Sequence, residues 1–452
     1  MKGVTELFVD QFSAKSAMKP SQTEFGWFEP DFKLKTSVSE AATISIRSSS
    51  MFKIHPFAAF RPIAAKSAEI SCEPGMRLTL KDAAQKVEAF PNSWLQVIRA
   101  DVREKLNLPH AGISLFERMK SAKWICQDAQ PHMYAYRHAR AGKKTVSLIT
   151  AMEISPAIFS TLLRFQKSDE ESVRQTWLRD EALAAHAEIP VLAFHPNEEL
   201  SDLIQSVTNE RPLAHFVGKD GATHTVWTCK ETERITELVG QLKSLVILSG
   251  DEMFARATHA GNSASVLRAV ALTSIERVSI RASRILVSGG DAALLEKHLS
   301  EFQDSNVLDS PENVGDPPAG FFDTYMACAE SAQEGGASAT GSWKRRRLPS
   351  IKSGNSVAAN WARTRFECAV ITPWIGACAS GEKITIHSMN AVISLAQLTK
   401  FVDSGEAQAA FVFATPSMDD LLEIAQGNET IPHHAITFTP AIPSGLFIQS
   451  IV

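Results

Sequence analysis

The sequence has no excess of charge of either sign and no long apolar run, and each absence excludes a class of protein. Its 452 residues include 46 lysines and arginines against 50 aspartates and glutamates, which gives a net charge of -4. This balance provides no overall field that would draw the chain to nucleic acid or anionic lipid. The longest apolar stretch, residues 366–379, is interrupted by Pro373 and is shorter than the roughly 20 residues that cross a bilayer. We therefore expect no membrane span.

Cysteine pairs with the spacing of a zinc site are absent as well. The six cysteines are scattered along the chain and none of them forms a CxxC motif. This usage predicts reduced thiols in the core of a cytoplasmic protein and no metal site. The cysteines are Cys72, Cys126, Cys229, Cys328, Cys368 and Cys378.

Several common catalytic signatures do not occur. The chain contains no GxSxG, HExxH or GxGxxG motif. Residues 376–383 come near to a phosphate-binding loop, but Glu382 stands between Gly381 and Lys383, and residues 384–386 predict a strand where that loop requires a helix. We therefore reject a phosphate-binding loop at this position.

What the sequence does have is enough apolar residues for a large core, arranged as alternating helices and strands. Hydrophobic residues make up 44% and charged residues 21%. The interleaved patterns predict an α/β (mixed α+β) fold with mixed sheets in one large two-lobed unit. Strands 133–136 and 145–149 are expected to form a hairpin around a basic turn at residues 141–143. Expected strands are 51–57, 93–98, 133–136, 145–149, 190–194, 223–228, 244–248, 384–386, 409–413 and 446–452, and expected helices are 78–90, 168–187, 231–242, 394–404 and 417–426.

Composition also suggests where the chain divides. Residues 1–50 lack the basic and apolar regions of a secretory signal, so we expect a mobile N-terminal extension. Residues 304–341 are rich in Asp, Pro, Gly and Ser, which predicts a long loop or insertion. The predicted N-terminal lobe is then 51–303, and the predicted C-terminal lobe is 342–452.

Two pairs of polar residues are candidates for a site. Asp251 and Glu252 follow the expected strand 244–248 and could act as paired carboxylates, although Ser249 or Asp251 could instead cap a following helix. His433 and His434 could serve in acid–base chemistry, since imidazole titrates near neutrality. Adjacent histidines on an extended segment point to opposite faces, so the pair does not favour a shared metal ion.

A basic run at residues 344–347 follows Trp343 and offers a third candidate. Four cations beside an aromatic residue could contact phosphates and bases. Such a run is also typical of a solvated strand end, and the negative net charge does not favour nucleic acid as a partner.

Short patches along the chain match one bacterial family in the same order. The chain resembles the family called domain of unknown function 1015 from about Met51 to Val452. The patches are residues 54–57 with Arg61 and Pro62, 92–97, 134–137, 220–227, 403–407 through 410–411, and 438–440 with 444–447.

The resemblance implies an ancestral phosphate site that this sequence has changed. Members of the family typically carry a DGHHR box after an apolar strand, similar to the box that grips phosphate in sulfiredoxin-like proteins and some free-serine kinases. Here residues 249–253 read Ser-Gly-Asp-Glu-Met, so of that box only Gly250 is retained. A second family segment, residues 160–171, keeps Arg164 and Lys167 but loses its His-Glu pair. Because carboxylates repel phosphate, the resemblance predicts that the ancestral ligand has been abandoned.

Three functional interpretations follow. The first is a diverged member without the ancestral activity that binds a small ligand or a partner. The second is a phosphotransferase-like enzyme acting on a small hydroxy metabolite such as serine, and the third is a nucleic-acid or protein adaptor that uses the basic run. These interpretations leave the ligand, any cofactor and the oligomeric state open. In the second, the anion-binding residues are Arg61, Arg164, Lys167 and Arg284, and the acid–base residues are Asp251, Glu252, His433 and His434.

Overall fold

The computed structural model describes most of the chain after the expected N-terminal extension. The predicted extension lies outside the described residues, as do Lys167, His433 and His434. The described residues are 51–451 without 75–77, 79, 110, 167, 169, 220, 255–264, 303, 309–315, 320, 327–341, 349–355, 379–383, 390–392 and 433–434.

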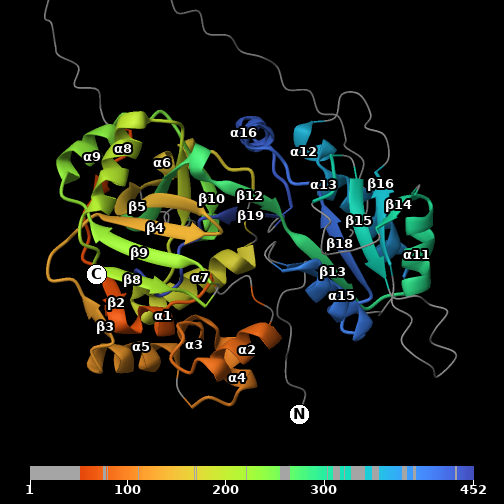
Figure 1. The fold of residues 1–452 in the computed structure, drawn as a ribbon, viewed down its shortest axis with the longest axis horizontal. Helices are drawn as coiled ribbons and strands as arrows, with labels where there is room; N and C mark the ends of the chain where they lie inside the picture. The colour runs from red at the N-terminus through yellow and green to blue at the C-terminus, as the bar shows by residue number, and fades with distance from the viewer. Residues whose placement is uncertain are drawn as a thin grey trace, which may run out of the picture. The chain divides into compact units, whose positions relative to one another are not determined.

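The larger sheet within the described residues has eight strands and is mixed (Figure 1). Its order is β10-β7-β11-β5-β4-β9-β8, and β1 pairs with β5. Strands β11 and β7 run parallel, whereas the other neighbours are antiparallel, so the predicted mixed α/β fold is confirmed. The strands are β1 (Ile54–His55), β4 (Tyr134–Arg140), β5 (Lys143–Ile154), β7 (Val191–Phe194), β8 (Ala214–Val217), β9 (Thr223–Thr228), β10 (Leu245–Ser249) and β11 (Val266–Ser274).

The hairpin of β4 and β5 forms where the sequence predicts it. Its two turn residues, Ala141 and Gly142, have φ angles of 48° and 80°, as the tight turns of two-residue hairpins require. Tyr134 and Tyr136 face one core, whereas Ala135 between them faces another. Both faces of the sheet are therefore buried. Helices α8 (Glu198–Ser206) and α9 (Thr232–Gly240) cover the face of Ala135, and Figure 1 shows them side by side.

A group of short helices forms a third core beside β2 (Phe60–Pro62) and β3 (Ile125–Gln127). The strand expected at 93–98 is wrong, because residues Leu95–Ile98 form helix α3. A short run that is mostly apolar fits a buried strand or a buried helical turn equally well. Here Leu95, Val97 and Ile98 pack into this core, while the buried amide of Gln96 donates to the backbone oxygen of Pro91. The other helices are α2 (Leu80–Ala89), α4 (Ala100–Lys105) and α5 (Gly112–Ser121), with α1 (Ser67–Ile70) nearby in sequence.

The second large sheet has the order β14-β16-β15-β18-β13-β17. Its strands are β13 (Arg284–Ser288), β14 (Asp304–Leu308), β15 (Phe321–Met326), β16 (Trp343–Arg347), β17 (Thr385–Met389) and β18 (Ala409–Phe413). Two of them, β14 and β15, lie inside the stretch 304–341 where composition predicts a loop. The polar and glycine-rich composition of that stretch gives no strand signal. In β15 the four central residues are all buried, so its sequence lacks the alternation of polar and apolar residues that would mark a strand.

Helices cover both faces of this second sheet. Leu295, Phe366 and Trp374 pack on one face, and Leu398 and Val402 pack on the other. The helices that carry them are α11 (Ala292–Ser300), α13 (Ala362–Phe366), α14 (Thr372–Ala377) and α15 (Leu395–Asp403), and α12 (Val357–Asn360) and α16 (Met418–Gln426) complete the region.

The last segment of the chain pairs with strands that come much earlier in the sequence. Strand β19 (Ile436–Thr439) pairs with β12 (Ser279–Ala282), and β20 (Gln449–Ser450) pairs with β6 (Ala185–His186). The strand expected at 446–452 is therefore mostly wrong, because only β20 lies within it. Within the part of the chain that the structure describes, every helix is too short or too polar to cross a bilayer.

Candidate functional site

The end of strand β10 is shaped by Gly250. This glycine has a φ of 83°, and a Cβ added to it would lie only 2.9 Å from the Cβ of Pro190. Only a residue without a side chain fits both the backbone conformation and the close approach. The register of β10 also shifts at Ser249, opposite Val191. The chain therefore turns sharply after β10 into a short 3-10 helix, η4 (Asp251–Met253).

Asp251 and Glu252 bind the segment before α7 (Glu170–Leu183) and do not cap a helix. The Asp251 carboxylate accepts the backbone N–H of Ser168 at 2.8 Å and its hydroxyl at 2.5 Å. The same hydroxyl lies 3.1 Å from Glu252. Gly250 occupies the N-cap position of η4 without a side-chain bond, so the predicted capping role of Ser249 or Asp251 is wrong.

The segment that carries Ser168 runs along the outer edge of β10. Leu163 forms a parallel bridge with Val246, and its backbone N–H and C=O bond to Leu245 and Ile247 at 2.9 Å each. This pairing adds a single bridged residue to the edge of the sheet next to β10. It brings Gln166 and Ser168 alongside the acidic pair.

A small cavity of about 70 Å³ lies at this end of β10. Three carboxylate residues line it, and among the described residues no lysine or arginine does. A single water needs roughly 10–15 Å³ in the same measure, so the space holds a few atoms of a ligand. The lining residues are Pro74, Gln166, Glu188, Ile189, Val191, Ile247, Leu248, Ser249, Gly250, Asp251, Glu252, Met253, Ala441 and Ile442.

The surroundings of Glu252 favour its protonated form. Burial, the adjacent Asp251 carboxylate and, more weakly, Glu188 raise the pKa of Glu252 to about 7, against the opposing effect of the Ser168 hydrogen bond. Glu252 is therefore close to half ionised at neutral pH.

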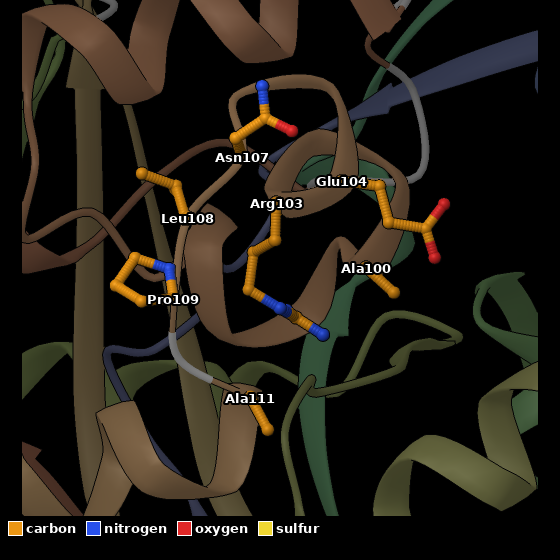
Figure 2. Close-up of a pocket in the computed structure, with 7 residues that line it drawn as sticks. All are labelled: Ala100, Arg103, Glu104, Asn107, Leu108, Pro109 and Ala111. Carbon is orange, nitrogen blue, oxygen red and sulfur yellow. The ribbon is translucent and has the colours of Figure 1, made fainter.

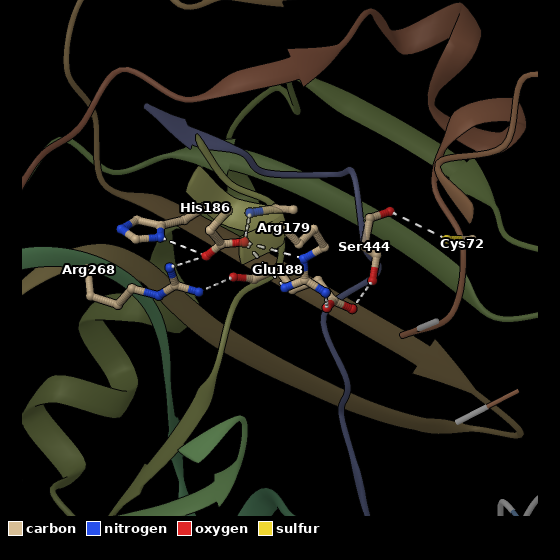
Figure 3. A network of polar contacts seen from close by, with 8 residues as sticks. Cys72, Arg179, His186, Glu188, Arg268 and Ser444 are labelled. Atoms are coloured by element: carbon tan, nitrogen blue, oxygen red, sulfur yellow. Dashed lines mark hydrogen bonds and ion pairs between the residues drawn. The ribbon is translucent and has the colours of Figure 1, made fainter. Parts of the chain in front are cut away.

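The third carboxylate, Glu188, is held by polar neighbours, which Figure 3 shows. One oxygen accepts from Arg179 at 2.6 Å and the other accepts from the Ser444 hydroxyl at 2.7 Å. The charge of Glu188 is therefore balanced, which leaves Asp251 and Glu252 as the carboxylates without a cationic partner among the described lining residues.

Arg179 and Glu188 belong to a buried charged network. Asp180 contacts Arg268 at 3.0 Å and His186 at 2.9 Å, and Arg268 also donates to the backbone oxygen of Glu188 at 3.0 Å. Burial lowers the pKa of Arg268 to about 10, which keeps it charged at neutral pH. Two arginines then balance two carboxylates in this network.

The structure brings together only some of the predicted site residues. Gly250, Asp251 and Glu252 line the cavity, and Lys167, His433 and His434 lie outside the described residues. The three predicted arginines are engaged elsewhere and do not line it. Arg61 pairs with Asp128 at 2.6 Å, Arg164 stacks on Phe159 at 4.6 Å from the ring centre, and Arg284 donates to the backbone oxygen of Ile393.

Sequence reasoning missed four residues around the cavity. Gln166 and Ser168 lie within the family segment that contains Arg164, so that segment was the signal that could have found them. Glu188 lies in no motif, and Ser444 begins the family patch 444–447, which gives no sign that it contacts Glu188. They meet across 256 residues of sequence, which no local pattern reveals.

A larger hollow of about 550 Å³ lies at α4 and collects none of the predicted residues (Figure 2). Its central side chain, Arg103, donates to the backbone oxygens of Gln96 and Val97 and so satisfies the end of α3. The cation thus has a structural role. The lining residues all come from one stretch of chain: Ala100, Arg103, Glu104, Asn107, Leu108, Pro109 and Ala111.

The basic run on β16 is also partly internal. The Trp343 ring is buried and its N–H donates to Thr399 at 3.1 Å. Arg345 pairs with Asp323 at 2.7 Å, and buried Arg346 donates to the backbone oxygen of Leu299 at 2.9 Å. At least two of the four cations therefore hold the second sheet together.

No metal centre emerges from the described residues. Within them, no group of three or more His, Cys, Asp or Glu side chains is arranged to hold a metal ion. The acidic pair at the end of β10, with Glu188 already paired, does not form such a set.

Comparison with known proteins finds one family that is similar to part of the chain. Residues 54–251 match the model of the family described as "Protein of unknown function (DUF1015)". The segment, 198 of the 452 residues, is similar to the DUF1015 family. The resemblance indicated by the sequence patches is thereby confirmed, and the matched segment includes β10 and reaches Asp251. No curated protein matches the chain.

Several solved structures show a weak overall likeness. SbnI with a C-terminal truncation from Staphylococcus aureus is 10% identical over 65% of this chain and 84% of its own, with a TM-score of 0.33. A free serine kinase in complex with AMP is 9% identical over 67% and 91%, with a TM-score of 0.35. A conserved hypothetical protein from Pyrococcus furiosus is 9% identical over 67% and 95%, also at 0.35.

Proposed function

We propose that this protein binds a small ligand in the cavity at the end of β10 and does not carry out phosphoryl transfer there. The ligand presents a cationic or hydrogen-bond-donating group to Asp251 and Glu252. One observation carries the proposal: three carboxylates line the cavity, and among the described residues no lysine or arginine does.

The charge of Asp251 distinguishes cationic ligands, which it attracts, from phosphate ligands, which it repels. Two unit charges about 4 Å apart interact by roughly 4 kcal/mol at an effective dielectric constant of about 20, which corresponds to about three orders of magnitude in affinity. A phosphate group beside Asp251 suffers this interaction as repulsion. An ammonium group at the same place gains it as attraction.

The size of the cavity supports a small group. Pockets that enclose drug-sized ligands measure roughly 300–1,000 Å³, several times more than the 70 Å³ at the end of β10. An ammonium group with one or two neighbouring carbons fits this space better than a nucleotide does.

The phosphotransferase interpretation receives less support from the geometry. It requires cations at the cavity, but Arg61, Arg164 and Arg284 are engaged with other parts of the fold. The loss of a DGHHR box stays a prediction from the family resemblance, and the acidic lining of the cavity agrees with it.

A thermal-shift series tests the proposed function. Ethanolamine and L-serine represent amines, and pyrophosphate and ATP, each with and without Mg²⁺, represent phosphates. A ligand that binds only the native protein raises its melting temperature. We expect a shift with an amine and none with the phosphates.

Charge-neutral variants assign the shift to the cavity. The double variant Asp251→Asn with Glu252→Gln should lose the amine shift. The control neutralises Asp202 and Glu198, which are exposed on α8, and should keep it. A shift with pyrophosphate or ATP that survives in the first variant would contradict the proposal.

A further inference from the structure

Ser444 connects three of the segments that line the cavity. Its backbone N–H donates to Cys72 at 2.8 Å and its C=O accepts from Cys72 at 3.2 Å. Cys72 precedes the lining residue Pro74 by two positions, and Ser444 follows the lining residue Ile442 by two. The Ser444 hydroxyl donates to Glu188, which belongs to the third of these lining segments, at 2.7 Å.

Glu188 is a fixed partner for this hydroxyl. Its side chain is held by Arg179, and its backbone oxygen is held by Arg268. Figure 3 shows Ser444 between Cys72 and Glu188, with the charged network on the far side of Glu188. Movement of the 441–445 segment away from the cavity must therefore break the Ser444–Glu188 contact, because Glu188 does not follow, as well as the two backbone hydrogen bonds to Cys72 if Cys72 stays in place.

The segment 441–445 lies between two anchored stretches. Before it, β19 is paired with β12. After it, Ile448 exchanges backbone hydrogen bonds with Phe60 at 2.8 and 3.0 Å, and β20 pairs with β6. Opening can thus be confined to the part of the segment that contains Ala441, Ile442 and Ser444.

We propose that the Ser444–Glu188 hydrogen bond is a latch that couples occupation of the cavity to docking of residues 441–445. The coupling rests on the proposed function, because it requires a ligand in that cavity. A ligand that touches both Ile442 and the end of β10 binds only the docked segment, so it stabilises the latch, and the closed latch in turn raises ligand affinity.

Two buried cysteines allow the latch to be observed. Cys72 and Cys229 are 6% and 5% exposed, and burial raises the pKa of each thiol to about 12. Both are therefore unreactive in the closed protein. Cys72 lies against Ser444, whereas Cys229 belongs to the separate core under α8 and α9. Local opening exposes Cys72 alone, and global unfolding exposes both.

The first test compares alkylation rates of the two thiols in the full chain, followed by mass spectrometry of the peptides. In the Ser444→Ala variant we expect the alkylation rate at Cys72 to rise roughly ten- to hundredfold, because losing a hydrogen bond to a buried charge makes local opening more frequent by about that factor. The rate at Cys229 should not change. The control Ser283→Ala removes another buried serine, whose hydroxyl lies 3.4 Å from Thr437, and should leave both rates unchanged. An unchanged Cys72 rate in Ser444→Ala, or an equal rise at both thiols, would overturn the latch.

The second test adds ethanolamine at about 100 times its dissociation constant. In the wild type, alkylation of Cys72 should slow by about 100-fold relative to Cys229. If ethanolamine raises the melting temperature but leaves the Cys72 rate unchanged, the coupling is wrong and the proposed function stands. If no amine binds, the proposed function fails, and the Ser444→Ala comparison alone decides whether the contact holds the segment.

Discussion

The carboxylate of Asp251 accepts both the backbone N–H and the hydroxyl of Ser168, at 2.8 and 2.5 Å. These two bonds fasten the end of β10 to the segment that leads into α7. They also fix the direction of the acidic pair, because Glu252 follows Asp251 in the same short helix. The placement of charge at the cavity therefore depends on one serine and one aspartate.

Replacing Asp251 by asparagine should destabilise the fold. An asparagine offers one acceptor oxygen where the carboxylate uses two, so one of the two Ser168 bonds to residue 251 is lost, and the hydroxyl is left with at most the longer contact to Glu252 at 3.1 Å. We expect the free energy of unfolding to fall by about 1–3 kcal/mol, as measured by urea denaturation. The control Asp202→Asn, at an exposed position of α8, should change it by less than about 0.5 kcal/mol. Equal effects of the two variants would show that the Ser168 contact does not hold the site.

Glu252 should make stability depend on pH. Its pKa of about 7 in the folded protein lies above its ordinary value of 4.5, so the folded state binds the proton more tightly than the unfolded state does. Stability should therefore fall as the pH rises from about 4.5 to about 7, by no more than about 3 kcal/mol.

The variant Glu252→Gln isolates this contribution. Glutamine does not ionise. The free energy of unfolding should therefore decrease less between about pH 5 and about pH 8 in the variant than in the wild type, and the difference is the contribution of Glu252. Urea denaturation at the two pH values measures it. A wild-type protein that is more stable at the higher pH, with the variant following the same curve, would show that Glu252 ionises with its ordinary pKa.

Replacing Glu188 by glutamine should lower the pKa of Glu252. The negative charge of Glu188 is one of the causes of the raised pKa. Glutamine keeps the hydrogen bonds, because its oxygen accepts from Arg179 and its amide donates to the Ser444 hydroxyl. The midpoint of the pH dependence of stability should move downward, and Glu153→Gln, a change at the distant pair with Lys53, should leave it in place. An upward shift in Glu188→Gln would contradict this electrostatic account.

The neighbours Arg346 and Arg347 should respond differently to substitution. Arg346 is 5% exposed and bonds to Leu299, whereas Arg347 is exposed. Arg346→Met leaves a buried carbonyl without its donor and should cost about 2 kcal/mol or more, while Arg347→Met should stay within about 0.5 kcal/mol. Thermal denaturation distinguishes them. If both variants lost equally little stability, Arg346 would be solvent-exposed, as the adaptor interpretation requires of the basic run.

Local patterns predicted the parts of the fold that local physics determines. Ser394 and Ser417 each begin a helix with a reciprocal capping box, and both helices lie where the sequence predicts them. The hairpin at Ala141 and Gly142 is also determined locally, because its turn needs positive φ angles at two neighbouring positions and glycine adopts them readily.

Contacts between distant segments account for what the sequence did not reveal. Residues Leu95–Ile98 are apolar at three of four positions and show no clear helical or strand period, so their helical form depends on the core that surrounds them. Asp251 has the side chain of a helix cap, but the serine that it binds lies 83 positions earlier and reaches it along the edge of β10. Glu188 is paired by Arg179 from α7 and by Ser444 from the last segment, and neither partner is visible in its local sequence.

Calorimetric titration of the wild-type protein with ethanolamine and with pyrophosphate, at about pH 8 and about pH 5.5, tests the central claim most directly. At the higher pH Glu252 is ionised, so ethanolamine should bind, and its affinity should fall by about tenfold at the lower pH as Glu252 takes up a proton. Pyrophosphate should show no binding at the higher pH. Tighter binding of pyrophosphate than of ethanolamine at about pH 8 would contradict an acidic cavity that selects against phosphate.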